Sequence, residues 1–303
     1  MKSSKFKIQR LGYILATALF AFVIVGCDKV DAPYKETQNA TPPDTTKPTT
    51  NSDTDYVFDA TRKILVEDYT GHQCGNCPKA AEKLEELIGI YGSKIVPLAV
   101  HAGFFADIAA APFTKDFKTS VGNELDTYFG NSVAGNPNGM VNRKGFPNSH
   151  IQNLNSWNGL LSPITTTNPD IVFAIKNKYD AATNVVETKI YTKFKNSLTG
   201  NYKLCVYLTE DSIIDAQTDY RLTPDDVNPN YLFEHVLRAS FNSTWGETIA
   251  TDPFASEINV LRNKYSMSLS GKLFNLSHPC NVVAFIYNDI TKEVIQASMQ
   301  KIK

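Results

Sequence analysis

The sequence has no excess of positive charge and no long membrane-spanning apolar run. Its 303 residues carry 30 Lys and Arg against 31 Asp and Glu, so the electrostatic footprint of a nucleic-acid-binding protein is absent. The apolar run Leu11–Val25 would extend about 22 Å as a helix, short of the ~30 Å hydrocarbon core. A hydrophobic content of 42% excludes wholesale disorder, and the length accommodates two ordinary domains.

Residues 1–26 have the layout of a signal peptide. Four basic residues and no acidic one precede the apolar run, namely Lys2, Lys5, Lys7 and Arg10. The run ends in Ile-Val-Gly-Cys27, which resembles the lipobox of bacterial lipoproteins. That resemblance implies cleavage before Cys27 and acylation of Cys27, which would anchor the chain in a membrane. The alternative is a plain secretory signal in which Cys27 is incidental.

The segment after Cys27 has almost no apolar residues. Residues 27–57 are rich in Thr, Pro, Asp and Asn, so ordering them would cost entropy and gain little burial. We therefore predict a flexible tether. We expect two folded domains after it, a first at residues 58–166 and a second at residues 167–303.

The first expected domain begins with alternating strand and helix patterns. Ile64–Tyr69 predicts a buried strand, and apolar residues spaced from Ala80 to Tyr91 predict an amphipathic helix. Ile95–Val100 predicts a second apolar strand. The pattern is typical of an α/β domain.

Two cysteines, Cys74 and Cys77, lie between the first strand and the helix. Helix N–H groups favour an anion at this position, which lowers the pKa of a thiol there. We therefore predict that Cys74 is a nucleophile and that Cys77 is the thiol that resolves a mixed disulfide. Pro78 suits a first helical turn, and His72 and Lys79 are expected to add positive charge.

This arrangement resembles the thioredoxin fold. Besides the Cys-Gly-Asn-Cys motif, the segment Gly-Asn-Pro137-Asn-Gly precedes a predicted strand and hairpin. The resemblance implies a cis-proline at Pro137, facing the cysteine pair. It also implies a buried acid six residues before Cys74, at Asp68, that would move a proton for Cys77. Glu67 is adjacent, so an assignment one residue earlier stays open.

Several features depart from that pattern. Gln73 replaces the usual aromatic residue before the first cysteine, and about 35 residues between His101 and Gly135 replace a short connection. Helices are expected at Phe113–Phe129 and near Ser149–Leu161. These differences leave the redox potential and the substrate open.

Two other interpretations of the cysteine pair remain. It is a structural disulfide or an inactive dithiol on a thioredoxin-like scaffold, because a fold does not by itself fix a function. Alternatively, His72, Cys74 and Cys77 bind zinc, although a nearby fourth ligand and a second Cys-x-x-Cys motif are lacking.

The second expected domain has the alternating pattern of short strands. Together with the first part, this predicts an α/β thioredoxin-like domain followed by an all-β sandwich of Ig-like type. The irregular stretch Asp211–Ala255 is expected to be a large loop or flap. The predicted strands are Ile171–Lys176, Val185–Lys193, Tyr202–Thr209, Tyr265–Leu269, Val282–Tyr287 and Val294–Met299.

Two further cysteines, Cys205 and Cys280, fall in predicted strands. In an exported protein they favour a structural disulfide, the alternative being two buried thiols. The cluster Asp225-Asp226-Val-Asn228-Pro-Asn230 matches no EF-hand spacing and predicts a turn. We expect no metal and no cofactor.

Over most of the mature chain the sequence resembles the outer membrane protein 28 family of lipoproteins. The resemblance implies an outer-membrane location and a thioredoxin-like domain. The matching segments are the lipobox, Tyr69-Thr-Gly71 before the cysteine motif, Val100-His-Ala-Gly103, Asn136-Pro137, Val141-Asn142-Arg143, His235-Val-Leu-Arg238 and Trp245-Gly246.

Two functions follow as hypotheses. The first is a lipid-anchored thiol–disulfide oxidoreductase that acts on thiols and disulfides of exported proteins, with Cys74, Cys77, Pro137 and Asp68 at its centre. The second is a non-catalytic lipoprotein whose β-sandwich is a binding module. The segment Tyr231–Arg238 is expected to be core and a solvated edge, or else part of a recognition surface.

Overall fold

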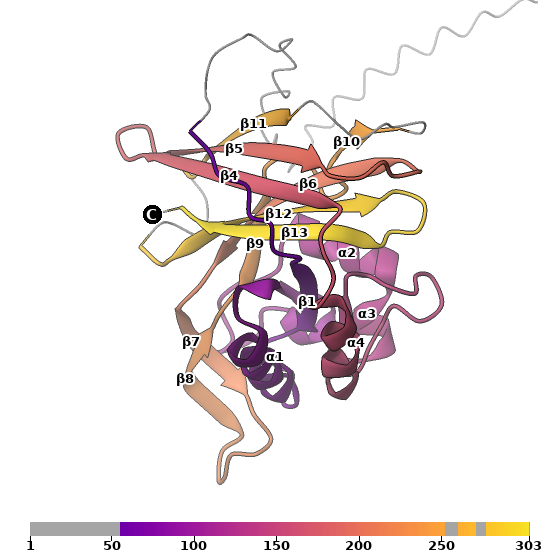
Figure 1. The fold of residues 1–303 in the computed structure, drawn as a ribbon. Coiled ribbons are helices and arrows are strands. Elements are labelled where there is room, and N and C mark those ends of the chain that lie inside the picture. Colours follow the sequence, from indigo (N-terminus) through magenta and orange to yellow (C-terminus); the bar gives the residue numbers. More distant parts are fainter. Residues whose placement is uncertain (1–54, 252–259, 271–276, 303) are drawn as a thin grey trace, which may run out of the picture. The chain divides into compact units, whose positions relative to one another are not determined.

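The computed structural model describes residues 55–251, 260–270 and 277–302. The predicted signal peptide at 1–26, the predicted lipidation site Cys27 and the predicted tether up to residue 54 lie outside these residues. The described chain has a mixed α/β fold with several sheets, shown in Figure 1. Its α-helices are α1 (Cys77–Tyr91), α2 (Ser120–Phe129), α3 (Asn131–Ala134) and α4 (Trp157–Ile164).

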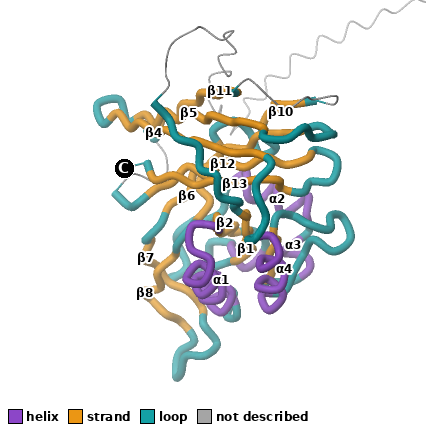
Figure 2. Tube along the Cα trace, in the orientation of Figure 1, coloured by secondary structure: helices purple, strands orange, loops and turns teal. Residues whose placement is uncertain are grey.

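Three sheets organise the described strands, as the orange segments of Figure 2 show. The largest has the order β13-β12-β6-β9-β2-β1-β3, with β10 paired to β6, and the others are β11-β5-β4 and the hairpin β7-β8. The strands are β1 (Ile64–Thr70), β2 (Ile95–His101), β3 (Asn138–Val141), β4 (Ile171–Asp180), β5 (Val185–Phe194), β6 (Tyr202–Glu210), β7 (Ile213–Thr218), β8 (Val227–Phe233), β9 (Val236–Ser240), β10 (Glu247–Ala250), β11 (Leu261–Ser268), β12 (Cys280–Asn288) and β13 (Val294–Lys301).

β1 and β2 pair in parallel, from Ile64 opposite Ile95 to Thr70 opposite His101. Every residue of both strands is buried. Burial on both faces explains why the apolar residues Ile64–Val66 of β1 and Ile95–Val100 of β2 run consecutively rather than alternating with polar ones. The predicted strand–helix–strand unit is therefore confirmed.

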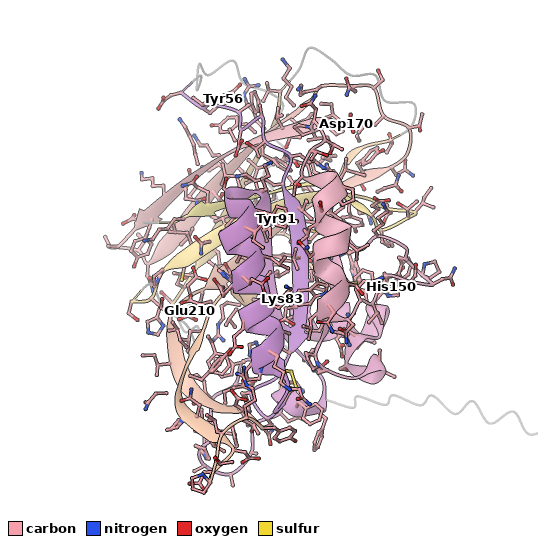
Figure 3. All side chains as sticks on the ribbon, turned by 60° about the horizontal axis from the view of Figure 1, so that its bottom comes forward. Tyr56, Lys83, Tyr91, His150, Asp170 and Glu210 are labelled. Atoms are coloured by element: carbon pink, nitrogen blue, oxygen red, sulfur yellow. A yellow bond between two sulfur atoms is a disulfide. The ribbon has the colours of Figure 1, made fainter. Side chains whose placement is uncertain are left out.

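Helices cover both faces of the β1–β2 strand pair. On one face of the sheet, side chains of β1 pack with Leu84 of α1 and Trp157 of α4. Figure 3 looks onto this face, and the two helices flank the central strand in the view. On the other face, Leu65 and Val96 pack with Leu125 of α2. Alternate residues of one strand thus enter two different cores.

The sheet β11-β5-β4 packs on the largest sheet through an apolar layer. Ile171 and Ile190 from the smaller sheet share a core with Leu204 of β6 and Val282 of β12. The larger sheet continues beyond this layer into β1 and β3, because β9 pairs both with β6 and with β2.

The prediction that Asp211–Ala255 is a loop or flap is wrong for about half of its length, and residues 252–255 lie outside the described part of the chain. The segment contains β7, β8, β9 and β10. The sequences of β9 (Val-Leu-Arg-Ala-Ser) and β10 (Glu-Thr-Ile-Ala) do not alternate strictly between apolar and polar residues, so they lack the pattern that indicates a strand. β9 is fixed instead by its neighbours, since Ala99 of β2 lies opposite Val236.

Two predicted helices are shorter than expected. The helix predicted at Phe113–Phe129 begins only at Ser120, where the Thr119 side chain accepts a 2.9 Å hydrogen bond from the Gly122 N–H. Before that cap, Phe117 is buried against β-strand residues. The helix predicted near Ser149–Leu161 is α4, which begins at Trp157.

Candidate functional site

The cysteine pair lies at the N-terminal end of α1. Cys74 and Cys77 form a disulfide, with their Cα atoms 5.3 Å apart, and it lies at the end of α1 opposite Tyr91 in Figure 3. Cys77 is the first residue of the helix, and Pro78 follows at a position where no helical N–H partner is needed. The predicted placement between strand and helix is confirmed.

Both sulfur-bearing residues are buried. Cys74 is 3% exposed and Cys77 is 1% exposed. A nucleophile that reacts with another protein must be reachable, so Cys74 is closed to a protein partner in this conformation.

The β7–β8 hairpin covers the cysteine loop. The Thr218 N–H donates to the His72 carbonyl at 2.8 Å, and the Tyr220 N–H donates to the Gly75 carbonyl at 3.0 Å. The Gln217 side-chain amide donates to the carbonyl of Cys74 at 3.0 Å. The chain after β7 therefore runs along the loop through backbone hydrogen bonds, as an added strand would.

Gly75 is the residue that lets the hairpin lie so close. A Cβ atom at this position would be 2.3 Å from the Tyr220 ring, closer than atoms pack. The Gly-Asn dipeptide between the cysteines thus has a packing reason in this chain. The hairpin residues carry no local motif, and their distance along the sequence from Cys74 hides their role from sequence analysis.

Asp68 and Glu67, the two candidates for the buried acid, point to different surroundings. Glu67 makes a two-pronged ion pair with Arg143, at 2.7 and 2.8 Å, and both side chains are fully buried. Asp68 instead lines a cavity together with Cys77. Of the two candidates, Asp68 is therefore the one that lines the same cavity as Cys77.

The Asp68 carboxyl is 2% exposed. Its Oδ1 atom has no hydrogen-bond partner among residues 55–251, 260–270 and 277–302. Burial raises the pKa of the Asp68 carboxyl to about 7. A carboxyl with this pKa exchanges a proton readily near neutral pH.

The two residues expected to add positive charge differ in the structure. His72 is buried, and burial lowers the pKa of its ring, so it is largely neutral at neutral pH and the expectation for His72 is wrong. Its Nε2 atom lies 3.0 Å from the Asp107 carbonyl oxygen. Lys79 stays exposed and donates to the Asn76 side chain at 3.1 Å.

Pro137 follows a cis peptide bond after Asn136, as predicted. Asn138 lies opposite Tyr69, so Pro137 lies at the end of β1 from which the cysteine loop departs. The Asn138 side chain donates to the carbonyls of Asn131 and Gly135 and thereby holds the preceding loop. Three further cis prolines, Pro112, Pro147 and Pro224, had no sequence signal.

The predicted disulfide between Cys205 and Cys280 is contradicted. In the pairing of β6 with β12, Cys205 lies opposite Phe285 and Cys280 lies opposite Glu210. The two residues are therefore about 17 Å apart along the strands, whereas bridged Cα atoms lie within ~7 Å. Both are buried thiols, and they belong to cores on different faces of the sheet.

Metal ligation has no support within the described part of the chain. No group of three or more His, Cys, Asp or Glu side chains there has the arrangement of a metal site.

Comparison with protein families identifies the class of protein to which the chain belongs. A family of outer membrane proteins matches residues 122–303, which is more than half of the chain. The family is described as outer membrane protein Omp28, and the chain belongs to it. This membership confirms the resemblance inferred from the sequence and the location at the outer membrane.

Solved structures add two similarities. HBP35 of Porphyromonas gingivalis is 16% identical, with a TM-score of 0.56 over 80% of this chain and 76% of that chain, which is a likeness of fold alone. A domain of the outer membrane lipoprotein Omp28 from the same organism is 23% identical, with a TM-score of 0.30 over 45% of this chain and 89% of that chain. Curated proteins gave no match.

The described helices have at most 15 residues. None of them is both long enough and apolar enough to cross a bilayer.

Proposed function

We propose that this outer membrane protein exchanges disulfides with exported proteins through Cys74 and Cys77. In this proposal residues 58–166 form a thioredoxin-like domain, residues 167–303 form an Ig-like β-sandwich, and lipid on Cys27 anchors the chain. The parallel pairing of β1 with β2, the start of α1 at Cys77 and the cis Pro137 at the same end of β1 support it.

One observation carries the proposal more than any other. Asp68 and Cys77 line the same cavity, and Oδ1 of Asp68 has no partner in the described part of the chain. A thiolate that leaves a disulfide needs a proton, and a buried carboxyl with a pKa of about 7 supplies one.

The exchange balances as two successive substitutions at sulfur. A thiolate of the exported protein attacks Sγ of Cys74, the Cys74–Cys77 bond breaks, and Cys77 leaves as a thiolate that takes the proton of Asp68. A second thiolate of the same exported protein then attacks its own sulfur in the mixed disulfide, and Cys74 leaves as a thiolate. Two electrons pass from the exported dithiol to the cysteine pair. The reverse sequence reduces a disulfide.

This exchange requires the β7–β8 hairpin to move. The hydrogen bonds from Gln217, Thr218 and Tyr220 close the loop around the disulfide, so the closed form protects it. The hairpin packs through one small cluster of Phe117, Ile213, Phe233 and Val236, and segments with few buried apolar contacts open more readily than core strands. The proposal therefore includes an open form that reacts and a closed form that does not.

The packing of the β7–β8 hairpin over the cysteine loop also favours a second function. If the hairpin never opens, the Cys74–Cys77 bond is a structural staple, and the chain acts as a binding protein at the outer membrane. The burial of Cys74, at 3% exposed, is the observation in its favour.

Trapping of mixed disulfides separates the two functions. We expect the full-length Cys77→Ser protein, in which Cys74 has no resolving thiol, to capture exported proteins in bonds that a reducing agent releases. The Cys74→Ser variant should capture none, and Cys205→Ser, which changes a buried thiol elsewhere, should turn over like the wild type. Equal disulfide exchange by wild type and Cys74→Ser would rule out the exchange function and leave a structural disulfide in a binding protein.

A further inference from the structure

A cavity of about 450 Å³ opens between α1 and the segment that joins β8 to β9. This volume lies in the range of pockets that hold small organic ligands. One wall is the face of α1 that carries Ala81 and Leu84, and the other wall includes Phe233. Asp68 of β1 and His101 of β2 also line it, between these walls.

Two buried polar side chains of the cavity, Asp68 and His101, have atoms without partners in the described part of the chain. Asp68 is 2% exposed and His101 is 3% exposed. Oδ1 of Asp68 and both ring nitrogens of His101 have no hydrogen-bond partner within the described ranges. Buried polar atoms are nearly always satisfied in native proteins, so three unsatisfied atoms around one cavity indicate a ligand that pairs with them.

His101 is held by aromatic rings rather than by hydrogen bonds. Its ring stacks on Phe117 with centroids 4.8 Å apart and contacts Phe233 at 5.6 Å. Burial lowers the pKa of His101 to about 3, so the ring is neutral and offers one donor and one acceptor. It therefore adds no positive charge that would repel a cation.

Carboxylates outnumber cations around the opening. Glu82 pairs with Arg221 at 2.7 Å, and Arg221 also pairs with Asp219 at 2.6 Å. Similarly, His235 lies between Glu85 at 3.1 Å and Asp211 at 3.2 Å.

Glu234 adds a fifth carboxylate to this set. Hydrogen bonds to Asp211 and Glu85 outweigh burial and raise the pKa of His235 to about 9. Among the residues that line the cavity itself, three glutamates, Glu82, Glu85 and Glu234, accompany one cation, His235. The resulting field attracts positive ligands and repels anions.

We propose that this cavity binds an alkylammonium group, either on a small free amine or on a lysine side chain of a polypeptide. The ammonium donates to the Asp68 carboxylate, and the methylene stem packs between Ala81, Leu84 and Phe233. The carboxylates at the opening suit a second ammonium of a diamine. This inference goes beyond disulfide exchange, and it is tested on the oxidised protein, where no exchange is needed.

Calorimetric titration of the full-length oxidised protein tests the site with four probes. They are 1,5-diaminopentane, 1-aminopentane, Nα-acetyl-lysine amide and the neutral 1-pentanol. We expect at least one amine to bind at least tenfold more tightly than 1-pentanol. Binding of acetyl-lysine amide alone would assign the site to polypeptides, and binding of the diamine alone would assign it to free amines. An equal affinity for 1-pentanol and all amines would overturn the proposal.

Variants locate the binding in the cavity. Asp68→Asn keeps the shape and removes the carboxylate, and Ala81→Phe fills the space from α1. Each should weaken amine binding at least tenfold. Glu86→Gln is the matched control, because Glu86 lies on α1 outside the cavity and pairs with Lys83. Unchanged affinity in both cavity variants would place any amine site elsewhere and refute the assignment.

Discussion

The backbone N–H of Tyr220 donates a 3.0 Å hydrogen bond to the carbonyl oxygen of Gly75, the residue directly after Cys74. The two residues come from distant parts of the chain, one from the β7–β8 hairpin and one from the cysteine loop. The bond belongs to a set that also includes the Gln217 side chain. Access to the disulfide is therefore controlled by the hairpin rather than by the loop itself.

Weakening the hairpin should expose the disulfide. Gln217→Leu keeps a similar volume but removes the hydrogen bonds to Gly71 and Cys74, which are worth about 1–3 kcal/mol together. If reduction proceeds through the open form, we expect a small phosphine to reduce Cys74–Cys77 roughly 5- to 100-fold faster than in wild type.

The control for this experiment is Ile214→Ala. Ile214 is 59% exposed on the same strand, and its aliphatic side chain has no group that could hydrogen-bond to the cysteine loop. Its reduction rate should match that of the wild type. If Gln217→Leu is reduced no faster than Ile214→Ala, the hairpin does not limit access.

Asp68 should make stability fall as pH rises. Burial raises the pKa of its carboxyl from 3.8 to about 7, so the folded state holds a proton that the unfolded state has lost between these values. Stability from this group is therefore full below about pH 4 and is lost as pH rises to about 7, by up to roughly 4 kcal/mol.

Urea unfolding at pH 4 and pH 8 measures this effect. Asp68→Asn cannot ionise, so we expect it to be more stable than wild type at pH 8, with the advantage shrinking at pH 4. Asp225→Asn, at an exposed position, should follow the wild type at both values. A constant difference between Asp68→Asn and wild type across this range would contradict the assignment.

The ion pair of Glu67 and Arg143 should be costly to break. Both side chains are fully buried, and the Arg143 guanidinium also lies 4.9 Å from the ring centroids of Phe129 and Phe285. Glu67→Gln leaves the guanidinium charge without its counter-ion, so we expect a loss of about 3–5 kcal/mol in the free energy of unfolding.

An exposed pair provides the comparison. Lys264 pairs with Glu187 at 2.8 Å with its side chain 57% exposed, and Lys264→Ala should cost less than about 1 kcal/mol. Denaturant unfolding of both variants measures the difference. Similar losses in the two would mean that burial does not set the strength of the Glu67–Arg143 pair.

Thiol counting tests the state of Cys205 and Cys280. Both are buried thiols, and burial raises the pKa of the Cys205 thiol to about 12. We expect neither to react with a thiol reagent in the native protein, and both to react after denaturation without reduction. Peptide mapping that finds Cys205 bonded to Cys280 would contradict the presence of two buried thiols.

Local sequence signals predicted the centre of the candidate site. The apolar runs of β1 and β2, the apolar spacing of α1 and the position of Pro78 depend on residues close together in the chain. The thioredoxin resemblance added Asp68 and the cis state of Pro137, and the structure places Asp68 in the cavity with Cys77.

Long-range contacts escaped prediction for one physical reason. β9 is a strand because β2 and β6 lie on either side of it. The sequence of its five residues does not indicate which strands it pairs with. The same holds for Cys205 and Cys280, whose separation depends on the register of β6 with β12. Register comes from the packing of whole faces, which spacing along one strand does not encode.

The sequence by itself thus determined that a cysteine pair stands at the start of a helix beside two buried strands, since periodic burial and helix-end chemistry act over a few residues. Only the tertiary structure decided that the β7–β8 hairpin closes over this pair and that Asp68 and His101 meet in one cavity. Those contacts join segments whose proximity results from the cooperative packing of the entire sheet.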